Sequence, residues 1–354
     1  MGRFARLVGI NLLVLLVLAL AIELVFGSWF YGPDFGALNV GVNALRTELD
    51  SPYYPPGTEV IYRRDAYGLR GDYGDPGAIT ILAIGGSTTN DRAIGQGDTW
   101  TDVLEQALRA QGYDHVVANA GVDGHSSYGH IKSFELWYPN IPNLHPDYAI
   151  IYVGHNDRGV APGDIPQADL LTSPSWSRRV GSYVANHSIF ARAYKNLLGW
   201  IAARRIDVVY GEVDTDPATV TFVPMPDVDV DAAAMDLSLK AYHERLKVLN
   251  QLALDFGTTP VYVTQPVGLV REGPNGLEVV ADSNAARIYR EMQGYNAELL
   301  AFCREADAIC IDLAGELAFD IQDFYDAIHT TPSGSRKIGE FLANKWPDAV
   351  EPPP

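Results

Sequence analysis

Four separated clusters of polar residues in this chain hold the side-chain types that act on carbonyl carbons. They occupy residues 85–90, 119–124, 154–157 and 326–334. The first holds a serine after two glycines, the second a glycine turn, the third an asparagine, and the fourth an aspartate three residues before a histidine. A hydroxyl with an imidazole base and nearby N–H donors is suited to nucleophilic attack. Each cluster alone is common loop chemistry, so its meaning depends on the surrounding fold.

The first three clusters directly follow short apolar runs that predict strands. Residues 79–84 are nearly all apolar, as expected of a strand buried on both faces. Residues 115–119, 148–153, 261–264 and 308–313 predict four more strands. In an open parallel sheet, active sites lie at the carboxyl ends of the strands. We therefore expect the first three clusters to share one edge of the sheet.

Amphipathic helices are predicted between these strands. Asp98 can cap a helix that Gly112 closes, because the apolar residues between them fall on one stripe. Apolar residues at steps of 3 and 4 predict longer helices over 235–256 and 285–302, and a last helix runs through 338–346. Strands that alternate with such helices predict an α/β fold, in which three α/β/α layers enclose a mostly parallel, five-stranded sheet.

In this order and at these strand edges, the four clusters resemble those of the SGNH hydrolases of the GDSL lipase/esterase superfamily. The resemblance covers roughly residues 79–346 and implies an SGNH/flavodoxin-like fold; residues 67–71 are also similar to a motif of membrane-anchored bacterial members. The Gly-Asp-Ser signature of the group reads Gly85-Gly86-Ser87 here. The missing aspartate is not one of the four catalytic residue types, so its loss bears on the subgroup more than on the chemistry.

The resemblance assigns a role to one or two residues in each cluster. It implies Ser87 as the nucleophile, Asp326 and His329 as the rest of a catalytic triad, and Ser87, Gly121 and Asn156 as oxyanion-hole donors. A serine hydroxyl needs a base, which His329 would supply while Asp326 holds the other ring nitrogen. No metal and no organic cofactor is needed. The Asp-x-x-His spacing, and Thr89 where a nucleophile elbow requires glycine, argue against the α/β-hydrolase fold.

The resemblance implies a serine esterase or acyl hydrolase that acts through an acyl-enzyme on an O-acylated small molecule, glycan or lipid. Two alternatives stay open. One is an acetyltransferase of the same fold, which shares the acyl-enzyme step. The other is a catalytically silent, membrane-anchored binding or scaffold protein. The presence of all four catalytic residue types favours an enzyme.

The N-terminal residues 7–26 predict a transmembrane signal-anchor helix. They contain one ionisable group, Glu23, and follow Arg3 and Arg6, which predict a cytoplasmic N-terminus. The rest of the chain would then be periplasmic or on the cell surface. A cleaved secretory signal is the alternative, because residues 19–21 have a small-x-small pattern. A buried core helix is the third interpretation.

These signals divide the chain into five expected parts. They are a cytoplasmic N-terminus (1–6), the anchor helix (7–26), an extracytoplasmic linker or arm (27–77), the hydrolase domain (78–347) and a tail (348–354). Within the linker, residues 67–71 either dock on the domain or form a turn with an exposed Arg70. The domain carries an insertion at 157–231 with a helical stretch at 189–203, which forms either a lid or a packed decoration.

Charge and the remaining reactive residues set further limits. The 354 residues carry a formal net charge of −18, which argues against nucleic acid and predicts a neutral or locally shielded ester substrate. Cys303 and Cys310 are either buried small apolar residues, which the sequence favours, or a disulfide. The histidines at 125, 130 and 155 are expected to be polar loop residues rather than metal ligands. Asp157 either supports the loop of Asn156 or caps the following segment.

Overall fold

The computed structural model of the chain describes residues 2–27, 29–30, 35–49, 51–160, 180–181, 183–184, 187–191, 193–194, 219–274, 276–281, 283–350 and 352. The chain divides into two compact units, each described by itself. The anchor unit comprises residues 1–41 and 172–209, and the sheet unit comprises residues 42–171 and 210–354.

The sheet unit is built on a parallel sheet of five strands, which confirms the expected α/β fold. In spatial order the strands are β10 (Ile309–Ile311), β7 (Thr259–Val263), β5 (Tyr148–Tyr152), β3 (Ile81–Gly85) and β4 (Val117–Asn119). Every residue of β3 is buried, because this strand has neighbours on both sides and helices on both faces.

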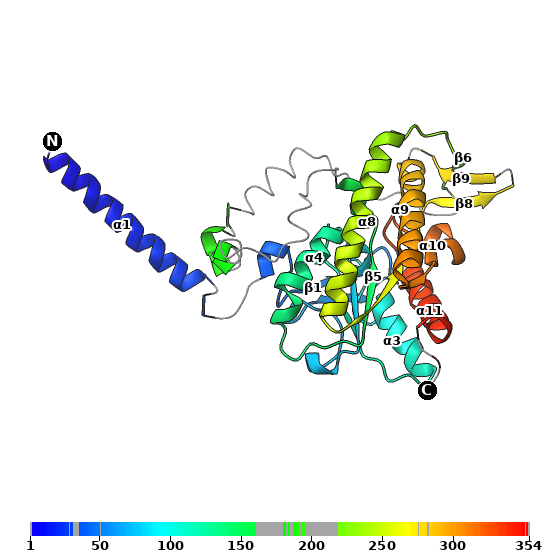
Figure 1. Cartoon of the computed structure of the whole chain (residues 1–354), viewed down its shortest axis with the longest axis horizontal. Helices are drawn as coiled ribbons and strands as arrows, with labels where there is room; N and C mark the ends of the chain where they lie inside the picture. The colour runs from blue at the N-terminus through cyan, green and yellow to red at the C-terminus, as the bar shows by residue number, and fades with distance from the viewer. Residues whose placement is uncertain are drawn as a thin grey trace. The chain divides into compact units, whose positions relative to one another are not determined.

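Helices cover both faces of this sheet (Figure 1). On one face, α3 (Trp100–Ala110) and α11 (Pro332–Ala349) pack against each other and against the strands. The other face carries α4 (Ser127–Leu136), α8 (Ala232–Asp255) and α9 (Ala285–Ala306), with α8 in contact with both α4 and α9. The three-layer arrangement predicted from the sequence is therefore correct.

The structure corrects one helix boundary and adds elements that the sequence pattern does not predict. The cap of α3 is Thr99 rather than Asp98, since the side chains of Thr99 and Asp102 accept each other's backbone N–H groups. The largest unpredicted element is α4. The short elements are α2 (Ser87–Asn90), α10 (Leu313–Glu316), the β1 (Leu45–Leu49) and β2 (Glu59–Arg63) hairpin, the antiparallel strands β6 (Phe222–Pro224), β9 (Gly276–Val280) and β8 (Val270–Gly273), and the 3₁₀ helices η1 (Phe35–Leu38), η2 (Pro76–Ala78), η3 (Tyr138–Asn140), η4 (Asp157–Gly159) and η5 (Ile321–Asp323).

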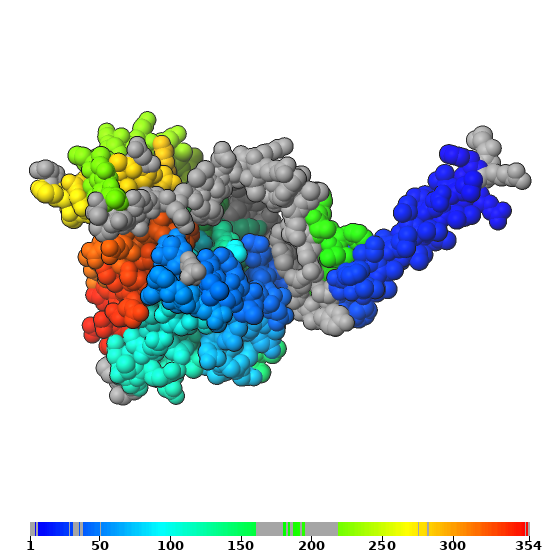
Figure 2. All heavy atoms as spheres, turned by 180° about the vertical axis from the view of Figure 1, so that it is seen from behind, coloured from blue at the N-terminus to red at the C-terminus, as the bar shows by residue number. Residues whose placement is uncertain are grey.

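Residues 42–77, which the sequence assigns to a linker, are part of the sheet unit. Arg70 forms a backbone bridge with Asn119, at the free edge of β4. Its side chain is 1% exposed, so the expectation of a turn with an exposed arginine is wrong and the docking alternative is correct. Figure 2 shows this segment, in mid-blue, on the surface of the sheet unit beside the red C-terminal elements.

A disulfide bond joins Cys303 in α9 to Cys310 in β10, with their Cα atoms 6.2 Å apart. The expectation of two unpaired buried cysteines is therefore wrong. Asp307, at φ 51°, ends α9 in a left-handed turn that brings the chain back toward the helix within a few residues. This reversal is what places two cysteines seven residues apart within bonding distance.

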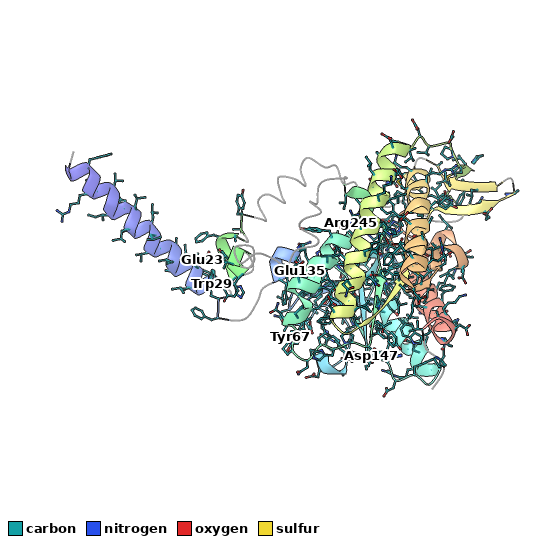
Figure 3. All side chains as sticks on the ribbon, viewed as in Figure 1. Glu23, Trp29, Tyr67, Glu135, Asp147 and Arg245 are labelled. Carbon is teal, nitrogen blue, oxygen red and sulfur yellow. A yellow bond between two sulfur atoms is a disulfide. The ribbon has the colours of Figure 1, made fainter. Side chains whose placement is uncertain are left out.

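The anchor unit contains α1 (Gly2–Phe26), whose residues Arg6–Phe26 are long and apolar enough to cross a membrane. The carboxylate of Glu23 accepts hydrogen bonds from Trp29 Nε1, from the Ser188 hydroxyl and from the backbone N–H of Ile189 (Figure 3). The one acidic group of the apolar stretch thus binds residues of the insertion. Most of that insertion, including 195–203 of its expected helix, lies outside the described residues.

We predict that the disulfide stabilises the sheet unit measurably. Replacing Cys303 and Cys310 by alanine should lower the free energy of unfolding by about 2 kcal/mol, because the unfolded chain regains the entropy of the opened loop. Urea unfolding would measure this difference. Reductant should shift the wild-type midpoint similarly and leave the double variant unchanged. An identical midpoint for wild type and variant would contradict the prediction.

Candidate active site

Two glycines allow Ser87 to stand at the end of β3, where the strand turns directly into α2. A Cβ on Gly85 would come within 2.9 Å of the Thr89 Cβ and of the Tyr152 carbonyl oxygen. A Cβ on Gly86 would overlap the side-chain amide of Asn156. Neither position has room for a side chain. The close approach therefore brings residues 85–90, called the nucleophile loop after the expected role of Ser87, against β5 and against Asn156, which follows that strand.

A continuous line of hydrogen bonds runs from Ser87 to Asp326. His329 Nε2 lies 2.8 Å from Ser87 Oγ, and His329 Nδ1 lies 2.7 Å from Asp326 Oδ2. The second carboxylate oxygen of Asp326 accepts the backbone N–H groups of Ile328 and His329 at 2.8 and 2.7 Å. The aspartate thus orients the imidazole and also closes the turn that carries it, which is why a spacing of three residues suffices.

The surroundings of Asp326 keep its carboxyl group ionised. Burial alone would raise its pKa, but the hydrogen bonds from the His329 ring and from the backbone of Ile328 and His329 outweigh burial, so the pKa lies below its usual value. An ionised carboxylate beside Nδ1 favours the tautomer in which Nε2 is free to accept a proton from Ser87.

Asn156 lies beside the nucleophile loop and is supported from beneath by its neighbour Asp157. Asn156 Nδ2 donates to the carbonyl oxygen of His125 at 2.9 Å. The fully buried Asp157 accepts the N–H and hydroxyl of Ser127 and forms an ion pair with Arg245 Nη2 at 2.9 Å. Arg245 reaches this site from α8 (Figure 3). Of the two expectations for Asp157, support of the Asn156 loop matches these contacts.

The second cluster differs from the expectation for Gly121. The N–H of Gly121 donates to Asn119 Oδ1 at 2.9 Å, so it is already bound within the domain. A Cβ at this position would lie 2.6 Å from the Thr89 carbonyl carbon and 2.8 Å from Asn90 Cα. Gly121 is thus required for close packing against the nucleophile loop, and its N–H is directed at the side chain of Asn119.

Gly124, further along the same loop, has the properties expected of a free backbone donor. Its φ of 77° is in the left-handed region, and a Cβ there would meet nothing within 4 Å. Among the described residues its N–H has no acceptor. Sequence reasoning missed this residue because the direction of an N–H depends on backbone dihedral angles that residue type alone does not reveal.

The rings of Tyr53, Tyr325 and His329 form one stacked column. The ring of Tyr325 stacks on His329 with centroids 5.5 Å apart and planes inclined by 7°. Tyr53, from the segment 42–77, stacks on Tyr325 at 4.9 Å. Burial raises the pKa of Tyr325, so its hydroxyl stays protonated. The sequence pattern does not predict either tyrosine at the site, because stacking between distant rings leaves no periodic signal.

Of the three histidines expected in loops, His125 and His155 do lie in loops, half-buried and buried respectively, whereas His130 lies in a helix. His130 lies in α4, fully buried, and His155 Nε2 contacts the carbonyl oxygen of Pro266 at 2.8 Å. Burial lowers the pKa of His155 to about 3, so this ring is neutral. Across the described part of the chain, no group of three or more His, Cys, Asp or Glu side chains is placed to hold a metal ion.

The chain is similar to several known proteins. A model of the GDSL-like lipase/acylhydrolase family matches residues 83–258. Esterase TesA of Pseudomonas aeruginosa is 26% identical over 138 residues, which cover 36% of this chain and 67% of that protein. Among similar solved structures are a psychrotrophic esterase EstA from Pseudoalteromonas sp. (12% identity, TM-score 0.41, covering 75% of this chain and 97% of that chain) and the acetylxylan esterase Axe2 from Geobacillus stearothermophilus (13%, 0.40, 74% and 91%).

We predict that the ion pair beneath Asn156 is costly to break from one side. Replacing Arg245 by methionine should lower the free energy of unfolding by about 3–5 kcal/mol, because Asp157 is left as a buried charge without a partner. Denaturant unfolding at pH 7 would measure it.

Two controls test the cause of that loss. Adding Asp157→Asn to Arg245→Met should recover part of the stability, because the unpaired charge is removed. Lys240→Met, which breaks an exposed pair with Asp236 on the same helix, should change the free energy of unfolding by less than about 1 kcal/mol. An Arg245→Met variant as stable as wild type would contradict the assignment.

Proposed function

The chain belongs to the GDSL-like lipase/acylhydrolase family and is a serine hydrolase, and from this premise we propose that Ser87, His329 and Asp326 are the triad of an esterase. The observation that carries the proposal is the unbroken line Ser87 Oγ to His329 Nε2 to Asp326, with links of 2.8 and 2.7 Å. These distances are those of a nucleophile and base ready for proton transfer.

In the proposed reaction, Ser87 Oγ attacks the carbonyl carbon of the ester while its proton passes to His329 Nε2. Asp326 stabilises the imidazolium through Nδ1–H and remains ionised throughout. The tetrahedral intermediate collapses, and His329 returns the proton to the departing alcohol, which leaves an acyl-enzyme on Ser87. Water, activated by the same histidine, then releases the acid and restores the serine.

The oxyanion of the intermediate needs hydrogen-bond donors around the position where its negative charge develops. We assign the backbone N–H of Ser87 and the side-chain amide of Asn156, which stays beside Gly86 through its bond to the His125 carbonyl. A further donor comes from residues 119–124, called the second loop, and here we propose Gly124 in place of Gly121. The reason is that the Gly121 N–H is bound to Asn119, whereas the Gly124 N–H has no acceptor among the described residues.

The proposed setting is outside the cytoplasm, with the chain attached to the membrane by residues 7–26. Three features support it: the length and apolarity of α1, the arginines that precede the apolar stretch, and the disulfide, since disulfides persist in oxidising compartments. Secretion after cleavage near residues 19–21 is the alternative. The domain limits expected at 27–77, 78–347 and 348–354 are part of this proposal, with the segment 42–77 belonging to the catalytic unit.

The proposed substrate is a neutral O-acylated glycan, lipid or smaller ester, because a chain with a net charge of −18 repels polyanions. For the same reason nucleic acid is not a proposed partner. An acetyltransferase is the second candidate, since transfer to a sugar hydroxyl replaces only the final attack by water. Product analysis with a saccharide acceptor present would separate the two, because a transferase gives the acylated saccharide and a hydrolase gives free acid.

We predict that Ser87 is the residue labelled by a fluorophosphonate. Ser87→Ala should abolish labelling and hydrolysis of p-nitrophenyl acetate, and His329→Ala should reduce both by at least about 10³-fold, because the base is lost. Ser283→Ala, a serine outside the site, is the matched control and should behave as wild type. A folded wild-type chain that is neither labelled nor active would favour the scaffold alternative and contradict the esterase proposal.

We also predict that Asn156 contributes mainly to the transition state. Asn156→Ala should lower kcat by about 10²- to 10³-fold with little change in KM, because the lost donor binds the oxyanion rather than the ground-state ester. Steady-state kinetics on the same substrate would measure both constants. The idea fails if KM rises while kcat is preserved, since that result would place Asn156 in substrate binding.

A further inference from the structure

Two arginines of the segment 42–77 are buried beneath the nucleophile loop. Arg64 is 4% exposed and Arg70 is 1% exposed. Among the described residues, neither guanidinium forms an ion pair with a carboxylate. Buried arginines are costly to desolvate and are usually paired, so two of them bound mainly to carbonyl and amide oxygens call for an explanation beyond general stability.

Arg64 forms hydrogen bonds with both the nucleophile loop and the second loop. Its Nη2 donates to the side-chain oxygen of Asn90 at 2.6 Å and also to the carbonyl oxygen of Gly121. Asn90 is the last residue of α2, which begins at Ser87, and Gly121 lies in the second loop. A single planar group therefore spans the nucleophile loop and the loop proposed to supply a backbone donor.

Arg70 holds the continuation of the nucleophile loop. Its Nη1 donates to the carbonyl oxygens of Asn90 and Asp91, the latter at 2.9 Å, and its Nη2 donates to that of Ile94 at 3.0 Å. Asp91 has a φ of 51°, a left-handed conformation that side-chain-bearing residues rarely adopt. The guanidinium thus binds the carbonyl groups where the chain turns sharply after the short helix.

Tyr62 links the two arginines to each other. Its hydroxyl accepts Arg64 Nε at 2.6 Å and donates to Asn90 Oδ1 at 3.0 Å. The Arg70 guanidinium lies 4.6 Å from the centre of the same ring. Asn90 is held from its other side by Asp123, which accepts its side-chain amide at 2.6 Å. The result is one connected set of contacts between the segment 42–77 and the residues that follow Ser87.

The same segment also reaches the histidine side of the site, through the stack of Tyr53 on Tyr325 and of Tyr325 on His329. We propose that Arg64 and Arg70 are positioning residues that hold the loop after Ser87 and the loop of Gly121 in their reactive arrangement, so that the segment 42–77 is part of the active site. The inference rests on the proposed function, because it takes Ser87 to be the nucleophile.

The test compares neighbouring arginines in the full-length protein. Arg64→Lys and Arg70→Lys keep the charge but lose the planar fork, so each should lower kcat for p-nitrophenyl acetate by about 10- to 100-fold with KM changed less than about 3-fold. Arg63→Lys is the matched control, because Arg63 is half-exposed and precedes Arg64 directly; it should match wild type. Thermal unfolding would establish that every variant is folded at the assay temperature.

Hydrogen exchange gives a second readout that does not depend on turnover. Amides of residues 87–94 and 119–124 should exchange faster in Arg64→Lys than in wild type or Arg63→Lys. If a lysine variant does not fold, Tyr62→Phe removes only one hydroxyl of the network and should lower kcat by about 3- to 10-fold.

The outcomes separate this inference from the esterase proposal. A wild-type enzyme that turns over through Ser87, with lysine variants that keep wild-type kcat, would overturn the positioning role alone. Lower stability with unchanged kcat would do the same, since it shows a purely structural role. Absence of Ser87-dependent turnover in wild type would overturn both.

Discussion

The contact between Ser87 Oγ and His329 Nε2 joins residues 242 positions apart, and much of the sheet unit serves to bring them together. Ser87 stands at the end of β3, and the loop after it is held by α3, since Trp100 Nε1 donates to the Thr88 carbonyl oxygen at 3.2 Å. His329 lies three residues before the start of α11 at Pro332. The two helices pack so closely that a Cβ on Gly339 would lie 2.6 Å from the Trp100 carbonyl oxygen. The interface of α3 and α11 therefore sets the distance between Ser87 and His329, the proposed nucleophile and base.

The opposite face of the sheet positions Asn156, a proposed donor of the oxyanion hole, by a different kind of interaction. Asn156 precedes a fully buried carboxylate, which is neutralised by Arg245 of α8 and by the start of α4 at Ser127. Close packing holds α3 against α11, whereas Asp157 is held by a buried ion pair. Both arrangements limit the movement of short loops, and the geometry of a hydrogen-bonded site depends on such limits more than on the residues that touch the substrate.

The sequence predicts the elements of this site better than their contacts. Five apolar runs identify the strands, and because residues at strand ends share one edge, Ser87 and Asn156 are expected together and are found together. The disulfide depends on a chain reversal, and the burial of Arg70 depends on side-chain contacts. Neither leaves a periodic pattern in the sequence. The direction of the Gly121 N–H is decided by Asn119, two residues earlier, and a glycine-rich loop offers several equivalent candidates until the dihedral angles are known.

The segment 42–77 changes how the N-terminal region should be understood. As a spacer it would only connect a membrane helix to an independent enzyme, but its residues contact the nucleophile loop, the second loop and the stack on His329. The sheet unit, which carries the proposed active site, therefore begins at Val42, before the first strand of the large sheet. Cleavage near residue 21 and retention of the whole apolar helix leave this segment equally intact. The choice between anchor and signal then determines where the protein is held, while the contacts around Ser87 are the same in both cases.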